Sequence, residues 1–310
     1  MAGALLLGTS AALATGTTPD TTATAGAASD GAQEARTASV HHRARHHVRT
    51  GLDEPSLHSS SALVIDESTS AVLVSKHADV ATPIASITKL MTALVVLDAA
   101  QSLDEPLEIT HDDQNLDKPA SSRLTIGTTL SRGDLMHLAL MSSENRAAHA
   151  LGRNYPGGLA ACIAAMNAKA AELGMTSTHF VEPTGLSSDN VASPADLSKL
   201  VIAAAKNTTI QSFSTDSRYF VPVGRHLLEF RNTDSLVASN GWNIVVQKTG
   251  YIAEAGKCLV MKAIIEGRAV VIVLLDSIGK QTRLADARRI KKWMETRLSA
   301  DSLRATAHRA

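Results

Sequence analysis

Residues 83–100 read PIASITKLMTALVVLDAA, an apolar run with helical spacing that opens on a serine and a lysine. Side chains three residues apart lie one above the other on the same face of a helix. Ser86 and Lys89 are therefore a candidate pair of nucleophile and base. The same spacing also arises by chance in the solvated first turn of a helix, so it needs support from elsewhere in the chain.

Two tripeptides further along the chain supply that support. Ser143-Glu144-Asn145 follows the apolar run LMHLALM, and Lys248-Thr249-Gly250 ends a β-rich segment. The order Ser-x-x-Lys, Ser-x-Asn, Lys-Thr-Gly is typical of penicillin-recognising acyl-serine enzymes. Taken alone, Ser143 and Asn145 could simply cap the next helix, and Lys248 could be a solvated charge before a turn.

Composition indicates a globular chain. Its 310 residues are 44% hydrophobic, which suffices for a substantial core. Thirty basic residues balance 30 acidic ones, so we expect no nucleic-acid partner. No run of about 18 or more apolar residues occurs, so we also expect no transmembrane helix.

The first 50 residues differ from the rest in composition. Residues 1–14 contain an apolar stretch that ends in Ala12-Leu13-Ala14, like a secretory segment and cleavage site, although a positive leading region is missing. We expect a truncated signal peptide here and a periplasmic, exported protein. Residues 15–50 have almost no large apolar side chains, so we expect a flexible linker.

A basic histidine stretch, His41–His47, lies within this linker. No carboxylate or cysteine accompanies it, which favours a solvated basic segment over a metal site. The alternative is that residues 41–50 recruit an anionic wall polymer or a lytic enzyme.

Periodicity predicts an α+β fold. Residues 62–65 and 71–74 are β-rich and form a hairpin signal, and helical spacing dominates from Ser86 to about Asn207. Ser131 and Asp134 resemble a capping box, and Gly174 is placed to end a helix. Three β-rich segments from Gly241 onward predict an antiparallel meander. The last helix carries an apolar stripe that should cover a sheet face, formed by Ile290, Trp293, Met294 and Leu298.

The run from about Ser60 to Leu298 resembles the transpeptidase-like domain shared by low-molecular-mass penicillin-binding proteins and serine β-lactamases. Stretches such as LALMSSENRAA, FVEPTGLS and KTGYIAEAGKCLVM narrow the similarity to the periplasmic D-alanyl-D-alanine endopeptidases. The resemblance implies one domain over residues 51–300, followed by a tail at 301–310. It also implies that the N-terminal hairpin joins the three C-terminal strands in one antiparallel sheet, flanked by helices and interrupted by an inserted helical region.

The resemblance assigns the acylating groups. Ser86 would attack the substrate carbonyl, and Lys89 would act as the base, which requires burial and nearby cations to depress the pKa of its amine. Ser143 would connect Lys89 to Lys248 and relay the proton to the leaving amine. Which group serves as the base in acylation is disputed across the superfamily.

The resemblance also assigns substrate contacts. Asn145 would bond the substrate backbone, while Lys248 and Thr249 of the Lys-Thr-Gly250 motif would hold the terminal carboxylate. The backbone N–H groups of Ser86 and Tyr251 would form an oxyanion hole.

The implied activity is hydrolysis of D-alanyl-meso-diaminopimelate crosslinks between peptidoglycan stems through an acyl-enzyme, with β-lactams as covalent inhibitors and no cofactor or metal. A D,D-carboxypeptidase is the first alternative, but such enzymes usually carry a β-rich second domain and an amphipathic membrane anchor. Only about a dozen polar residues follow Leu298, so we expect no membrane anchor. A serine β-lactamase is disfavoured because no glutamate motif of the class A kind is present. A catalytically weak penicillin-binding or wall-binding module is the remaining alternative.

Some reactive side chains are expected to have structural roles. We expect Glu144 to be an exposed charge. His137 and His149 have no evident acidic partner in the sequence, so packing is favoured over a histidine-based triad. Cys162 lies in a helical segment and Cys258 in a strand, and we favour two unpaired thiols over a disulfide.

Overall fold

The computed structural model describes residues 54–114 and 121–307, with side chains to Arg297. The expected signal peptide, the linker and the basic histidine stretch lie outside the described residues. The helical elements are η1 (Ala85–Ile87), α1 (Thr88–Asp98), η2 (His111–Asp113), α2 (Arg132–Met141), α3 (Asn145–Arg153), α4 (Gly158–Glu172), α5 (Pro194–Ala204), α6 (Thr208–Thr215) and α7 (Thr282–Ala307). The strands are β1 (Ser59–Asp66), β2 (Ala71–Lys76), β3 (Thr82–Pro83), β4 (Pro106–Glu108), β5 (Thr129–Ser131), β6 (Val191–Ala192), β7 (Arg218–Val223), β8 (His226–Arg231), β9 (Asn243–Ile252), β10 (Gly256–Ile265) and β11 (Arg268–Ser277).

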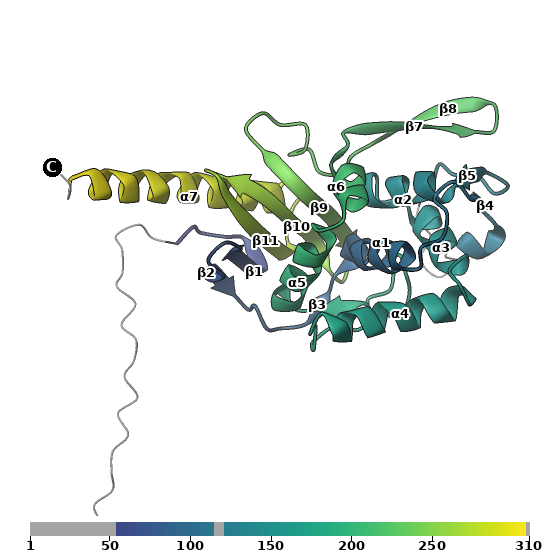
Figure 1. Cartoon of the computed structure of the whole chain (residues 1–310), viewed down its shortest axis with the longest axis horizontal. Coiled ribbons are helices and arrows are strands. Elements are labelled where there is room, and N and C mark those ends of the chain that lie inside the picture. The colour runs from purple at the N-terminus through teal and green to yellow at the C-terminus, as the bar shows by residue number, and fades with distance from the viewer. Residues whose placement is uncertain (1–53, 115–120, 308–310) are drawn as a thin grey trace, which may run out of the picture. The chain divides into compact units, whose positions relative to one another are not determined.

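A five-stranded antiparallel sheet organises these elements, in the order β2-β1-β11-β10-β9. The register pairs Ser59 with Ser277, so the first and last strands of the sequence are neighbours. The predicted hairpin, the predicted meander and their union in one sheet are therefore confirmed. Figure 1 shows this sheet with α5 beside it and α1 to α4 further along.

The central strands of the sheet are buried on both faces. Ile272 and Leu274 of β11 pack with α7, whereas Val271 and Val273 belong to the larger core that contains the inserted helices. Successive strand residues point to opposite faces, so a strand covered on both sides must be apolar at nearly every position. This is why β11 is a continuous apolar run.

Helix α7 covers one face of the sheet, as predicted. Ile290 and Met294 are buried against the strands, and Trp293 packs at the margin of the same cluster. The side chain of Leu298 lies outside the described part of the chain. The helix continues to Ala307 and so includes most of the segment expected as a tail. Among the described residues, no helix is both long and apolar enough to cross a membrane.

Helix ends in the inserted region follow the sequence signals. Ser131 is the N-cap of α2, where its hydroxyl accepts from Asp134 N at 3.0 Å while its own N–H donates to the Asp134 carboxylate at 3.2 Å. Gly174 follows α4 with φ +68°, and Met175 N donates to Ala170 O at 2.8 Å. Both predictions are confirmed, because each rests on a local hydrogen-bonding requirement.

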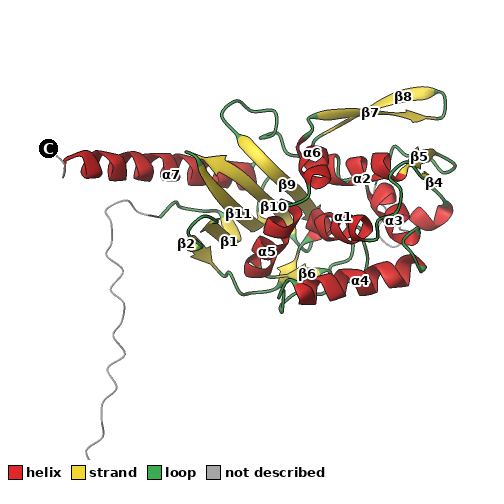
Figure 2. Cartoon of the chain, viewed as in Figure 1, coloured by secondary structure: helices red, strands yellow, loops and turns green. Residues whose placement is uncertain are grey.

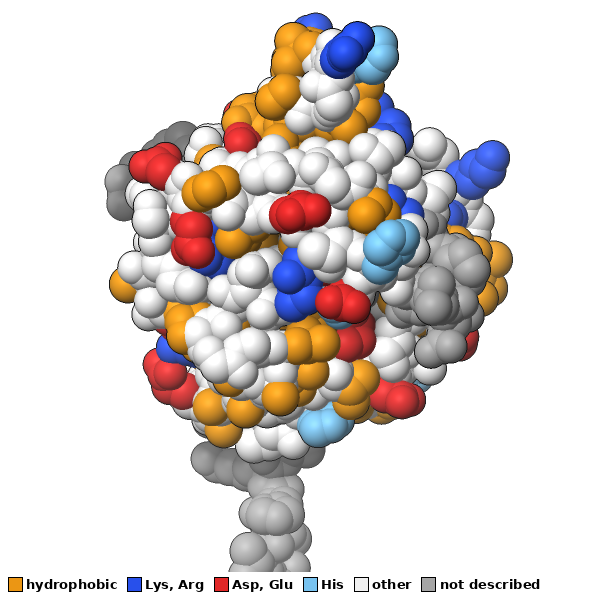
Figure 3. Space-filling model, turned by 90° about the vertical axis from the view of Figure 1, so that its right-hand side faces the viewer, with side chains coloured by type: hydrophobic (Ala, Val, Ile, Leu, Met, Phe, Trp, Pro, Cys, Tyr) orange, Lys and Arg blue, Asp and Glu red, His pale blue; other side chains and the backbone are white. Residues whose placement is uncertain are grey.

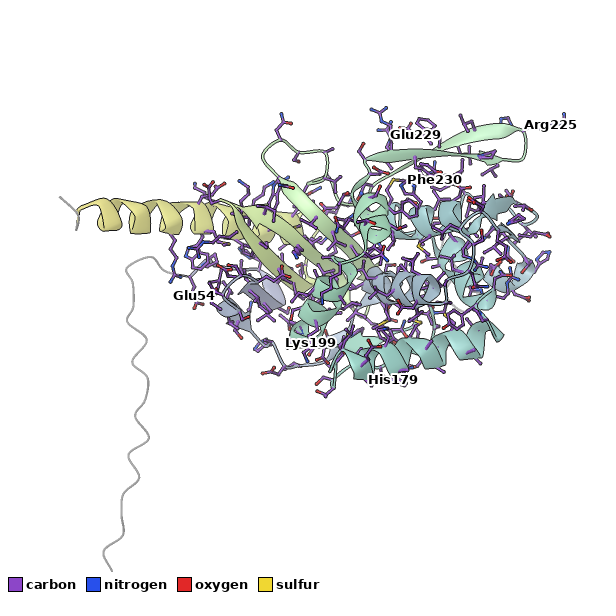
Figure 4. The ribbon with its side chains drawn as sticks, viewed as in Figure 1. Glu54, His179, Lys199, Arg225, Glu229 and Phe230 are labelled. Atoms are coloured by element: carbon purple, nitrogen blue, oxygen red, sulfur yellow. The ribbon has the colours of Figure 1, made fainter. Side chains whose placement is uncertain are left out.

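The hairpin of β7 and β8 was not predicted, and neither was α6. Pro222 within β7 weakens a strand signal, since proline cannot donate to a sheet. Figure 2 shows the hairpin standing apart from the main sheet. Arg225 is at its tip and Phe230 lies on β8 (Figure 4), where Phe230 is 2% exposed. Burial of this ring ties the hairpin to the helical core.

Replacing Asp286 should destabilise the fold. This buried carboxylate on α7 accepts from His58 N, Ser59 N and Ser59 Oγ at 3.0, 2.7 and 2.7 Å, and so ties α7 to β1. Asp286→Asn places an amide NH₂ against these donors and should lower the free energy of unfolding by about 1–3 kcal/mol. Urea denaturation measures the loss. Arg289 pairs with Asp286 from a partly exposed position, so Arg289→Gln should cost less than about 1 kcal/mol. Equal effects in the two variants would contradict this ranking.

Candidate active site

Ser86 lies in the short helical turn η1, immediately before α1. This turn lies next to β9, an edge strand of the main sheet. The preceding residue, Ala85, has φ +50°, a conformation that is costly for a residue with a Cβ. The Ala85 carbonyl accepts from Thr88 Oγ1 at 2.8 Å, which holds the turn against the start of α1. The turn directs Ser86 towards Lys89, one helical turn further along.

The amine of Lys89 has three oxygen neighbours. Its Nζ lies 2.8 Å from Ser86 Oγ, 2.7 Å from Asn145 Oδ1 and 2.5 Å from the Thr184 carbonyl. The amide and carbonyl oxygens can only accept, so each must receive an N–H from the amine. In the neutral amine, which has two N–H bonds and one lone pair, the lone pair is therefore left to face Ser86.

Burial lowers the pKa of both lysines at the site. Lys89 is 1% exposed, and burial lowers its pKa to about 8, while the negative charges of Glu182 and Glu144 act to raise it. With a pKa near 8, about one amine in ten is neutral at pH 7. Burial also lowers the pKa of Lys248, to which the nearby positive charge of Lys89 contributes. For Lys89 the expected lowering of the pKa comes from burial alone, because the neighbouring charges that act on this amine are the negative ones of Glu182 and Glu144 and not cations.

The Ser143 loop brings the second motif to Lys89. Ser143 has φ +61°, and the next helix begins at Asn145, whose side chain turns to Lys89. The alternative that Ser143 and Asn145 cap and start the next helix is correct only for the start: Asn145 is the first residue of α3, but the N-cap residue is Glu144 and it makes no side-chain capping bond. Among the described residues, no hydrogen bond joins the Ser143 hydroxyl to Lys89 or to Lys248.

Glu144 is buried, so the expectation of an exposed charge is wrong. Its carboxylate accepts from Ser122 Oγ at 2.5 Å, which ties the loop that precedes β5 to the Ser143 loop. Burial raises the pKa of Glu144, while this hydrogen bond and the charge of Lys89 act to lower it. Glu144 also lines a cavity of about 660 Å³ together with Arg123, whose guanidinium lies 3.9 Å from the centre of the Phe230 ring. Figure 3, which shows the right-hand side of Figure 1, has acidic and basic side chains interspersed over that face.

The third motif lies on β9, which forms an edge of the sheet. Lys248 is fully buried and donates to Thr249 O at 2.9 Å, so the alternative of a solvated charge is wrong. The Thr249 hydroxyl is 2.5 Å from that of Thr233. A Cβ added to Gly250 would lie 3.1 Å from Ser86 N, so the strand passes directly against the turn of the nucleophile. Tyr251 is 60% exposed, with Lys257 Nζ 3.9 Å from the centre of its ring.

The sequence analysis missed two contributors to the site. The first is the loop of Glu182, Thr184 and Asn190, which supplies a carbonyl to Lys89. The FVEPTGLS stretch of this loop was used above only as support for the family resemblance. The second is Arg283 of α7, whose Nη1 donates to Gly250 O at 3.1 Å. Nothing in the sequence pattern connects an arginine in the last helix with the Lys-Thr-Gly strand, because the contact depends on the tertiary fold.

The two histidines do have acidic partners, so that part of the expectation is wrong. His149 Nδ1 lies 2.8 Å from Asp113 Oδ1, and His137 Nε2 lies 3.1 Å from Asp216 Oδ2. His137 also stacks on Phe213, with ring centres 4.5 Å apart, and burial lowers its pKa. These are packing and polar contacts, and within the described residues neither ring contacts Ser86.

Both cysteines are buried and unpaired, in agreement with the favoured reading. Burial raises the pKa of Cys162 to about 12 and that of Cys258 to about 11. Neither thiol therefore has the low pKa of a nucleophile.

Comparison with known proteins agrees with this architecture. Residues 48–279 match the family described as D-alanyl-D-alanine carboxypeptidase, peptidase S11, and the chain belongs to this family of serine-type peptidases. It is 47% identical to the D-alanyl-D-alanine endopeptidase of Escherichia coli K12 over 249 residues, which are 80% of each chain. It is 49% identical to the D-alanyl-D-alanine endopeptidase of Pseudomonas aeruginosa over 243 residues, covering 77% of this chain and 78% of that one. The crystal structure of the Streptomyces K15 DD-transpeptidase superposes with a TM-score of 0.72 at 27% identity, covering 78% of this chain and 98% of that one.

Gly185→Ala should disable the site. A Cβ at Gly185, which has φ +81°, would lie 2.0 Å from Ala85 O and 2.8 Å from Ser86 N, so the turn that carries the nucleophile must move. A displacement of about 1 Å can cost roughly a hundredfold in rate. We therefore expect at least a tenfold slower acylation by labelled penicillin. Gly127 has φ +84° and no atom within 4 Å of an added Cβ, so Gly127→Ala controls for backbone strain alone. Similar acylation rates in both variants would show that the close approach at Gly185 is unimportant.

Proposed function

We propose that the chain is a serine D,D-endopeptidase that hydrolyses D-alanyl-meso-diaminopimelate crosslinks in peptidoglycan. The observation that carries this proposal is the buried Lys89 amine, 2.8 Å from Ser86 Oγ and aimed at it by two further oxygen acceptors. The chain's similarity to two bacterial proteins named D-alanyl-D-alanine endopeptidase supports the choice of substrate.

Acylation would begin at Ser86. The neutral Lys89 amine takes the hydroxyl proton as Ser86 Oγ attacks the carbonyl carbon of the D-alanine in the crosslink. The amide C–N bond then breaks, and the proton passes from Lys89 to the leaving amine of diaminopimelate, with Ser143 as the relay. Water hydrolyses the resulting ester and restores the serine. β-Lactams would enter the same first step and remain bound as stable esters.

The edge strand would bind the substrate. The backbone of β9 passes Ser86 at Gly250, and the N–H groups of Ser86 and Tyr251 would stabilise the oxyanion. An edge strand has unpaired backbone groups along one side, which suit an extended peptide. Asn145 would bond the substrate amide. Thr249 would hold the substrate carboxylate beside the charge of Lys248, and Arg283 supplies a further cation at Gly250 O.

The alternatives have weaker support. A β-lactamase of the class A kind activates water with a glutamate. Of the two carboxylates that act on Lys89, Glu182 accepts hydrogen bonds from its own loop at both oxygens, which makes it a poor base, and Glu144 accepts one from Ser122. A D,D-carboxypeptidase would use the same groups, and the products distinguish it. We place the protein in the periplasm, where its substrate lies. For the basic segment at 41–50, recruitment of a wall polymer or a lytic enzyme stays the alternative to a solvated segment.

One digestion tests the activity. Mass spectrometry of a purified crosslinked muropeptide dimer should detect the two monomers, because cleavage of the crosslink adds one water. Release of free D-alanine from the dimer's terminus would instead identify a carboxypeptidase. Ser86→Ala should give neither product and form no stable penicillin adduct. A penicillin adduct on this variant would remove Ser86 from the role of nucleophile.

Thr249→Val should weaken recognition of the substrate carboxylate. The hydroxyl beside Lys248 contributes one charge-assisted hydrogen bond, so its loss should lower acylation by carboxylate-bearing peptides by about 1.5–3 kcal/mol, or roughly ten- to a hundredfold. Amidation of that carboxylate should slow the parent protein and affect the variant much less. If amidation slows both proteins equally, Thr249 does not hold this group.

A further inference from the structure

The carboxylate of Glu182 is surrounded by hydrogen-bond donors from its own loop. Oε2 accepts from Thr184 N and Thr184 Oγ1, both at 2.6 Å. Oε1 accepts from Gly185 N at 2.5 Å and from Asn190 Nδ2 at 2.9 Å. One side chain thereby fixes both the backbone of residues 184–185 and the far end of the loop. A loop held from both ends has little freedom to change the direction of its carbonyl groups.

This loop contacts both sides of the nucleophile. The Thr184 carbonyl is 2.5 Å from Lys89 Nζ. Asn190 Nδ2 also donates to Thr88 Oγ1 at 3.1 Å, and Asn190 O accepts from Ile84 N at 3.1 Å. The segment that contains Ser86 and Lys89 is therefore held by the same loop that Glu182 organises.

We propose that Glu182 is a positioning residue for Lys89. Its hydrogen bonds direct the Thr184 carbonyl towards the amine, and its carboxylate places a negative charge near that amine. The inference rests on the role of base proposed above for Lys89. Because Thr184 O and Asn145 Oδ1 each take one N–H of the amine, the direction of the Thr184 carbonyl decides whether the lone pair faces Ser86. Glu182 acts through Thr184 and touches neither substrate nor nucleophile.

The charge of Glu182 has a separate effect from its hydrogen bonds. The charged groups around Lys89 are Glu182, Glu144 and Lys248, and burial opposes the protonated amine. The negative charge of Glu182 stabilises the ammonium form and so acts to raise the pKa of Lys89. Its removal should lower that pKa further, so that the amine becomes neutral at a lower pH.

The pH dependence of acylation tests the proposal. The rate constant for a fluorescent penicillin is measured between about pH 5.5 and about pH 10, together with the melting temperature. The parent protein should show an acid limb with a midpoint near 8. Glu182→Gln should move this midpoint to lower pH by about one pH unit, because the compensating charge is lost. Its plateau should fall at least about tenfold, because the amide NH₂ displaces at least two of the five donors to this side chain and misaligns the amine.

Thr184→Val is the matched control. It removes one donor to Glu182 but keeps the carboxylate and the Thr184 carbonyl, so its acid limb should stay at the parental pH. If Glu182→Gln keeps both the parental midpoint and the parental plateau, the proposal is wrong, whatever the change in melting temperature. A shift of the midpoint in Thr184→Val as large as that in Glu182→Gln would also overturn it, because the charge would then not be the cause.

Two further variants keep the test decisive. If Glu182→Gln does not fold, Glu182→Asp replaces it. This variant retains the charge, so its midpoint must stay near the parental value while its plateau falls, and a shifted midpoint overturns the proposal.

Lys89→Arg tests the base itself, because arginine does not release its proton in this range. Near-normal acylation in Lys89→Arg would refute the proposed role of Lys89, whereas inactivity of this variant combined with a parental profile in Glu182→Gln would refute Glu182 alone.

Discussion

The buried amine of Lys89 is the constraint on which the site depends. A lysine that is 1% exposed has lost its hydration, and the surrounding groups must replace it. They come from three separate parts of the chain: the nucleophile's own turn, the start of α3 and the loop before β6. None of them is a carboxylate in direct contact, which would hold the amine in its protonated form. These groups compensate only partly for the lost hydration, so the pKa of Lys89 lies near 8, where the ammonium and the free amine can interconvert.

The fold makes this meeting of segments possible. Strands β1 and β11 pair within the main sheet, and the edge strand β9 lies against the turn that carries Ser86. The close approach leaves no space for a side chain at Gly250 without movement of its neighbours, and even less at Gly185. Two residues with a Cβ, Ala85 and Ser143, adopt positive φ beside the site. Some of the backbone strain in the described residues thus lies where three segments converge on one amine.

Sequence reasoning identified the elements whose signals are local. The three motifs, the capping box at Ser131 and the β-rich composition of the C-terminal strands depend on nearby residues, and the structure contains them as expected. Three features depended instead on tertiary contact: the burial of Glu144, the acidic partners of the histidines and the approach of Arg283 to Gly250. A periodic pattern in the sequence gives no information about which distant segments come into contact. The β7–β8 hairpin was missed because Pro222 weakens the strand pattern that would have predicted it.

The two isolated thiols give the protein an internal reporter of its motions. Cys162 lies in the helical core and Cys258 in the sheet near the active site, and both are inaccessible in the native state. A thiol reagent can modify either residue only when the surrounding structure opens, so labelling rates measure local and global opening without any engineered probe. Because the two cysteines are not bonded to each other, folding needs no oxidant, and the stability of the folded chain is independent of the redox potential of its surroundings.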